Sequence, residues 1–229
     1  GRLGVWLSGA AGLPALALAA LAHLGLIGGL LILLLPALRT VAGRRQHAFG
    51  WALAALFLLA AGFYVDALRG QYPMRWLLAV LGLVMVLIIV AMSRISMRIV
   101  NRSIDEAGEG GAPYLARPPK RNLAILCIVL FTLAEFWHPG GRVSGWLACA
   151  AAAALCNLMG DWHVGRPLLR RWPFMLYAVY VCMALGYALI GTALLAGGPG
   201  ASAGRHLLTM GALGLSIYVV ISIAGRAHC

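Results

Sequence analysis

The sequence has few charged side chains: 18 basic and 6 acidic among 229 residues, or 10%. A soluble domain carries about a quarter of its residues as Asp, Glu, Lys or Arg, so this composition excludes an ordinary soluble enzyme and a disordered tail. The sequence also lacks a C-x-x-C pair. Four of its five cysteines fall within apolar runs, namely Cys127, Cys149, Cys156 and Cys182. A disulfide scaffold is therefore excluded, and we expect these four thiols to be buried.

Hydrophobic residues make up 62% of the chain, and the mean hydropathy is +0.91. They form long runs that are separated by short clusters of basic residues, which is typical of a polytopic membrane protein. A net charge of +12 would indicate nucleic acid binding in a soluble protein. Because the bases flank apolar runs, we instead expect an all-α transmembrane helical bundle in a lipid bilayer, with no nucleic acid partner.

The apolar runs predict about seven membrane spans, since a helix needs about 20 apolar residues to cross the hydrocarbon core. Glu135 interrupts the last turn of the fourth, which makes it the weakest of them. We expect a single transmembrane domain over residues 1–229 that is truncated at both ends, because the chain starts without Met and stops just after an apolar run. The predicted spans are 13–38, 47–68, 76–92, 122–137, 143–160, 173–196 and 207–224.

The connections between these spans alternate in charge. On one side there are 13 Lys and Arg residues, 12 of them in the connections 39–46, 93–121 and 161–172 and the last, Arg226, after the final span; on the other side there are five. The positive-inside rule therefore places the more basic connections in the cytoplasm. The longest of them, 93–121, contains acidic, Gly and Pro residues and is predicted to be a hydrophilic linker.

Ionisable groups near the membrane are candidate site residues, because they are costly there. Glu135 and His138 are three residues apart and share a helix face, so together with His206 they could bind a metal. Pro139 and Gly140 follow at once, however, and an ordinary helix end is the favoured interpretation of the pair.

Other polar groups have simpler interpretations. For His23, a hydrogen bond between helices is favoured over metal ligation. Asp161 and Trp162 end a span, where an aromatic membrane anchor is expected. The sequence contains no Ser-His-Asp, P-loop or H-E-x-x-H pattern, which favours a protein other than an enzyme.

A series of short motifs resembles the NnrS family. The segment 205–214, Arg-His-Leu-Leu-Thr-Met-Gly-Ala-Leu-Gly, and the later Gly225-Arg226-Ala227-His228 are similar to the C-terminal part of that family. Features further upstream follow in the same order: Arg44-Arg45, Met92-Ser93-Arg94-Ile95, Asn157-Leu158, Trp172-Pro173-Phe174-Met175-Leu176 and Leu185-Gly186-Tyr187.

The resemblance implies a bacterial inner-membrane protein of the nitric oxide response and denitrification that contains haem and copper. It also implies a homo-oligomer or membrane partners from denitrification. His206 and His228 carry over as family histidines and are the expected cofactor and metal ligands, whereas Ala184 and Asp66 stand where the family has histidine. Because 22 residues of helix separate His206 from His228, roughly 33 Å, we expect them to belong to two separate centres.

Two alternatives remain open at this point. The chain could be a secondary transporter whose ionisable groups form a path, although related halves and broken helices are not evident in the sequence. It could also be a structural or assembly subunit without a cofactor, whose histidines are helix-end anchors.

The charge distribution makes a direct prediction about topology. A reporter fused within 93–121 should behave as cytoplasmic, because this connection holds six basic residues. Cleavage at Arg102 by a protease added to intact spheroplasts would contradict the predicted orientation.

Overall fold

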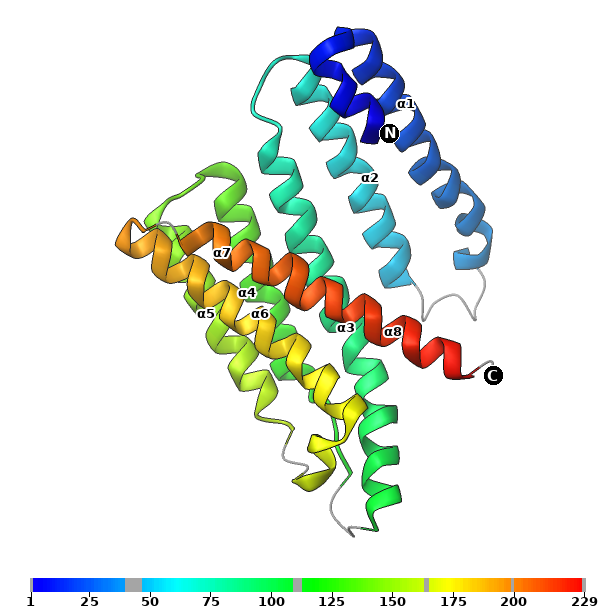
Figure 1. The fold of residues 1–229 in the computed structure, drawn as a ribbon, viewed down its shortest axis with the longest axis vertical. Helices are drawn as coiled ribbons and strands as arrows, with labels where there is room; N and C mark the ends of the chain where they lie inside the picture. Colours follow the sequence, from blue (N-terminus) through cyan, green and yellow to red (C-terminus); the bar gives the residue numbers. More distant parts are fainter. Residues whose placement is uncertain (1, 40–46, 109–112, 163–164, 199, 228–229) are drawn as a thin grey trace. The chain divides into compact units, whose positions relative to one another are not determined.

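A computed structural model of the chain describes residues 2–39, 47–108, 113–162, 165–198 and 200–227. Their regular structure is helical throughout (Figure 1), which confirms the predicted all-α fold. The chain divides into two compact units, Gly1–Leu83 and Val84–Cys229. The single domain expected over 1–229 stays a prediction, and each unit is considered by itself below.

The first unit is built on two helices, α1 (Arg2–Arg39) and α2 (His47–Leu68). Gly12 has a φ of 70° inside α1, so the helix is broken there and continues in a new direction. The two helices pack through Leu16, Ala19 and Ala20 of α1 and Tyr64 of α2. The small side chains allow the helices to approach closely, as is common between helices in a membrane.

Helix α3 (Met74–Ala107) contributes to both units and is 34 residues long. This corresponds to roughly 51 Å, compared with roughly 30 Å for the hydrocarbon core of a bilayer. The predicted linker 93–121 is therefore wrong in its first half, because residues 93–107 continue the helix. No Gly or Pro interrupts the chain between Leu83 and Gly108, where the helix ends with a φ of 65°.

The second unit also contains α4 (Pro118–Trp137), α5 (Arg142–Met159), the short 3-10 helix η2 (Arg166–Leu169) and α6 (Arg171–Ala196). Its last part is α7 (Gly200–His206), the π-helix η3 (Leu207–Leu213) and α8 (Gly214–Ala227). Helix α6 is central, since it packs against α5 and also against α7 and η3. Its buried residues include Leu176, Val179 and Met183.

Glycines allow α6 to approach both neighbours at backbone distance. A Cβ on Gly191 would lie 2.9 Å from the carbonyl oxygen of Gly145 in α5. A Cβ on Gly204 of α7 would lie 2.6 Å from the carbonyl oxygen of Gly186 in α6. Because backbone atoms cannot move aside as a flexible side chain can, these positions require glycine.

Within the described residues, six helical stretches are long and apolar enough to span a membrane, and α7, η3 and α8 form one of them together. The fourth predicted span forms a helix, α4, but it is not among the six. The reason is its charge. Lys120 and Arg121 lie near the start of α4 and Glu135 lies near its end, so the uncharged run between them is too short to cross the hydrocarbon core. The chain is thus a multi-pass membrane protein. Helix α4 differs from the six apolar stretches in the charged residues that it carries.

The contact between Gly204 and Gly186 predicts the effect of adding one methyl group. Gly204→Ala should destabilise the protein by about 1–3 kcal/mol, because the new Cβ overlaps a backbone oxygen. Gly225→Ala is the control: Gly225 is helical and has no atom within 4 Å of a Cβ, so this change should be neutral or stabilise by about 0.5–1 kcal/mol. Thermal unfolding in detergent measures both, and equal melting temperatures for the two variants would contradict the predicted close contact.

Candidate functional site

Glu135, one of the predicted metal ligands, is engaged by an ion pair. Its side chain is 6% exposed, and Oε1 accepts a hydrogen bond from Arg205 at 3.1 Å. Oε2 accepts the backbone N–H of Gly140 at 3.2 Å, in the turn that follows α4. The carboxylate therefore closes the end of its own helix and ties α4 to α7, which supports the helix-end interpretation.

The histidines of this region are exposed. His138 ends α4 with its backbone N–H bonded to the carbonyl oxygen of Ala134, and its side chain is exposed. His206 is the last residue of α7, and its side chain is exposed too. The π-helix η3 begins directly after His206, and π-helical turns often lie at functional sites. His228 lies outside the described residues.

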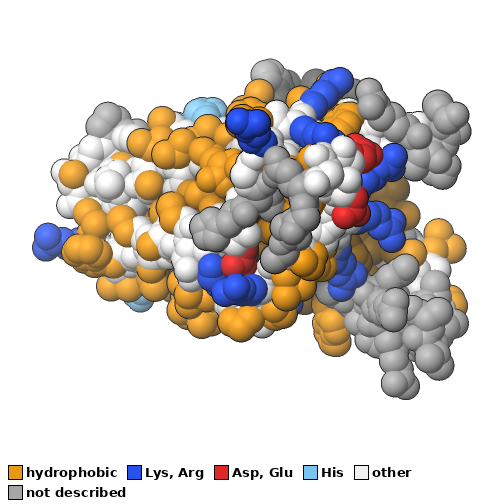
Figure 2. Space-filling view, turned by 90° about the horizontal axis from the view of Figure 1, so that it is seen from below, with side chains coloured by type: hydrophobic (Ala, Val, Ile, Leu, Met, Phe, Trp, Pro, Cys, Tyr) orange, Lys and Arg blue, Asp and Glu red, His pale blue; other side chains and the backbone are white. Residues whose placement is uncertain are grey.

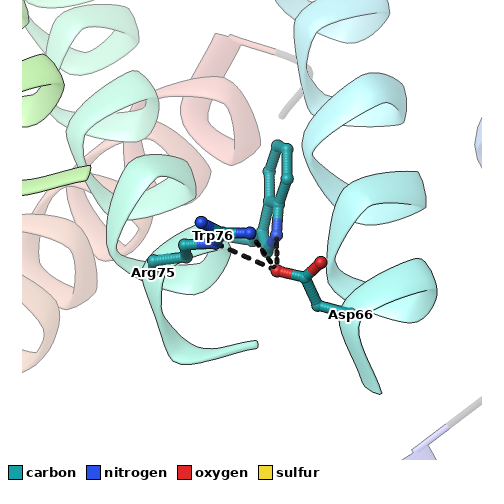
Figure 3. A network of polar contacts seen from close by, with 3 residues as sticks. All are labelled: Asp66, Arg75 and Trp76. Atoms are coloured by element: carbon teal, nitrogen blue, oxygen red, sulfur yellow. Dashed lines mark hydrogen bonds and ion pairs between the residues drawn. The ribbon is translucent and has the colours of Figure 1, made fainter. Parts of the chain in front are cut away.

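Asp66 is the single acidic residue in the sequence of the first unit, and its carboxylate is bonded to Arg75 and Trp76 (Figure 3). Its Oδ2 accepts hydrogen bonds from Nε and an Nη of Arg75, at 2.9 and 2.7 Å, and from Nε1 of Trp76 at 2.7 Å. Gly62, one helical turn earlier, faces the Trp76 ring, and a Cβ there would lie 2.5 Å from the ring. Asp66 thus joins α2 to the start of α3.

His23 is bonded to a neighbouring helix, as predicted. Its Nδ1 lies 3.1 Å from the hydroxyl oxygen of Tyr64, and the two rings meet edge to face. This contact links α1 to α2 beside the small-residue packing described above. His23 therefore serves helix packing, and the prediction of a helix–helix hydrogen bond is confirmed.

Asp161, at the end of α5, is engaged by α4. Its side chain is 3% exposed, Lys120 Nζ lies 2.8 Å from Oδ1, and the backbone N–H of Arg117 donates to Oδ2 at 3.2 Å. Helix α4 begins with two prolines, which lack N–H groups, and its start has no side-chain cap of its own. Asp161 accepts the backbone N–H of Arg117, the residue just before the helix.

The membrane anchor expected at Trp162 is wrong. Trp162 is 3% exposed and packs against Tyr114, Tyr177 and Tyr180, with ring centroids 5.0–6.1 Å apart. The segment before α4 places Tyr114 against Trp162. The backbone N–H and carbonyl of Tyr114 both form hydrogen bonds with the side chain of Asn101 in α3. Burial raises the pKa of Tyr114 to about 12, so its hydroxyl remains neutral at physiological pH.

In the described part of the chain, no three His, Cys, Asp or Glu side chains form a group that could hold a metal ion. The metal site suggested for Glu135, His138 and His206 is therefore not formed in this structure. Its carboxylate is already bonded to Arg205 and Gly140.

Comparison with known proteins identifies the family. The sequence matches the NnrS family, described as NnrS protein, over residues 1–229. The chain belongs to the NnrS family. No curated protein and no solved structure was found to match it. The match confirms the resemblance to the NnrS family that the short motifs indicated.

Several important residues of this NnrS protein were missed by sequence reasoning. These are Arg205 and Trp76, which bind the carboxylates of Glu135 and Asp66. A signal was present for Arg75, which follows Asp66 after a short connection. For Arg205 and Glu135, which are 70 residues apart, the sequence holds no indication that they pair.

The ion pair of Glu135 predicts different outcomes for two neighbouring substitutions. Glu135→Ala should lower stability by about 1–3 kcal/mol, because it leaves the guanidinium of Arg205 and the N–H of Gly140 without their acceptor. His138→Ala is the matched control on the same helix end and should change stability little, since its side chain is exposed. Folding yield and melting temperature are the measurements. Loss of a bound metal from Glu135→Ala at unchanged yield would instead indicate a ligand role.

Proposed function

We propose that this NnrS protein acts in the nitric oxide response of a bacterial inner membrane and binds haem through His206. The membership of the whole chain in the NnrS family carries this proposal. Six apolar helical stretches support the membrane location. We propose a protective role, or a role in handling a cofactor, rather than catalysis. The sequence contains no Ser-His-Asp, P-loop or H-E-x-x-H pattern.

The surroundings of His206 fit a residue that would hold haem iron, because haem iron is commonly held by a single imidazole. His206 follows Arg205, whose guanidinium is held by Glu135 of α4, so its backbone position is fixed. Its side chain is exposed near the start of the apolar stretch Gly200–Ile223, where a flat apolar group can approach. Bound haem would supply an iron centre for small diatomic ligands.

Copper fits the described residues less well. A copper site takes several imidazole or sulfur ligands, and among the described side chains no such group is assembled. His228, the other family histidine, lies outside the described residues. We propose that copper, where it is bound, uses His228 in a second centre separate from that of His206.

The alternatives predict different observations. A secondary transporter would take up a substrate into vesicles, and a structural subunit would do neither this nor bind haem. In the described structure the buried acids Asp66, Glu135 and Asp161 are each paired with a base. A transport path built on these carboxylates would have to break those pairs, which favours the haem proposal over a transporter.

Absorption spectroscopy tests the proposal. The full chain, purified from cells supplied with haem, should show a Soret band, and His206→Ala should lose it at unchanged yield. His138→Ala should keep the band, because this second exposed histidine lies on α4 and is assigned no cofactor. A chain that shows no Soret band, or a His206→Ala variant that keeps it in full, would contradict the assignment.

A further inference from the structure

The second unit carries a concentrated positive charge at the end where α3 finishes. Nine basic side chains lie there: Arg94, Arg98, Arg102, Arg117, Lys120, Arg121, Arg166, Arg170 and Arg171. Only three described acids accompany them, Asp105, Glu106 and Asp161. Figure 2, seen from this end, shows Lys and Arg side chains gathered with few acidic ones among them. We call this surface the basic end.

Contacts within the unit hold the basic end together. Glu106 accepts hydrogen bonds from Arg102, on its own helix, at 2.9 Å and from Arg170, before α6, at 3.0 Å. Lys120 and Arg117 meet at Asp161. The three acids therefore neutralise only part of the charge, and an excess of six positive charges remains on the described residues.

The last part of α3 has two distinct faces. Ser96, Val100 and Ile104 are buried, and the segment before α4 covers this side, with Tyr114 bonded to Ser96 and Asn101. Arg98 and Arg102 are one turn apart on the opposite side and are exposed, the Arg102 side chain by 81%. The fold thus buries one face of the helix and presents arginines on the other.

If Trp76 lies at one edge of the hydrocarbon core, the length of α3 places these arginines beyond the other edge, at the depth of lipid headgroups. Along α3, Arg98 and Arg102 follow Trp76 by 22 and 26 residues, which corresponds to roughly 33 and 39 Å. The hydrocarbon core is roughly 30 Å thick, and the headgroup layers extend the bilayer to roughly 40–45 Å. Side chains at this depth meet phosphates, and the planar guanidinium of Arg binds phosphate oxygens in pairs.

We propose that the basic end binds anionic phospholipid, with Arg98 and Arg102 contacting the headgroup phosphate. Charge complementarity selects the occupant, because a neutral zwitterionic lipid would not balance the excess positive charge. The second unit also exposes large apolar side chains on helices such as α5 and α6, and these side chains require a bilayer around them. Each basic residue near an anionic surface strengthens binding about fivefold, so removing both arginines should weaken it about 25-fold.

Lipid titrations of the full chain in neutral detergent test this proposal. Phosphatidylglycerol should bind and raise the melting temperature, and phosphatidylcholine should not. The variant R98Q/R102Q should bind phosphatidylglycerol about 25-fold more weakly than the wild type. Arg142→Gln should behave as the wild type, because Arg142 is exposed at the other end of α5, away from the basic end.

A second measurement does not depend on the variants. Native mass spectrometry of the wild-type protein in an equal mixture of the two lipids should show phosphatidylglycerol retained in preference. Equal retention of both lipids, or unchanged binding by R98Q/R102Q, would overturn the proposal. If inorganic phosphate alone raised the melting temperature as much as the lipid does, the surface would be a site for free phosphate and the lipid assignment would be wrong.

Discussion

A carboxylate at the edge of a bilayer must find a positive partner, because its charge is costly where water is scarce. The three acids with buried side chains in the described structure obey this constraint in the same way. Asp66 pairs with Arg75, Glu135 with Arg205 and Asp161 with Lys120, and each carboxylate is at most 6% exposed. Each pair joins two helices at their ends, so charge neutralisation and helix assembly are achieved by the same contacts.

This constraint also decides which groups remain for chemistry. Acidic residues near a membrane are the first candidates for metal binding, yet here each one is bonded to a base and to a backbone or indole N–H. His23 is bonded to Tyr64. Among the described residues, the exposed histidines His138 and His206 are therefore better placed to accept a ligand than these three buried acids.

Much of the helical architecture could be predicted from the sequence, because apolar runs of sufficient length admit few alternatives in a membrane. The extension of α3 also had a signal, since residues 93–107 contain no Gly or Pro and bury one face. The pairing of Glu135 with Arg205 and the contact of Gly204 with Gly186 had no such signal. Both join distant parts of the chain, and neither charge nor glycine content specifies a partner. The π-helix Leu207–Leu213 contains Gly211 and Thr209, whose hydroxyl bonds the carbonyl oxygens of Arg205 and His206; both residue types disfavour a regular α-helix, but they do not specify a π-helix.

Three successive residues show how these contacts position the candidate ligand. In a helix each residue is rotated by about 100° from the one before, so Gly204, Arg205 and His206 face three directions. Gly204 lies against the backbone of α6, and Arg205 reaches Glu135 of α4. His206 must then face away from both helices, and its exposed side chain agrees with this. Turning the imidazole inward would require α7 to rotate, which would break the ion pair and drive another residue into the glycine contact. The outward direction of His206 is therefore a consequence of how α7 is packed.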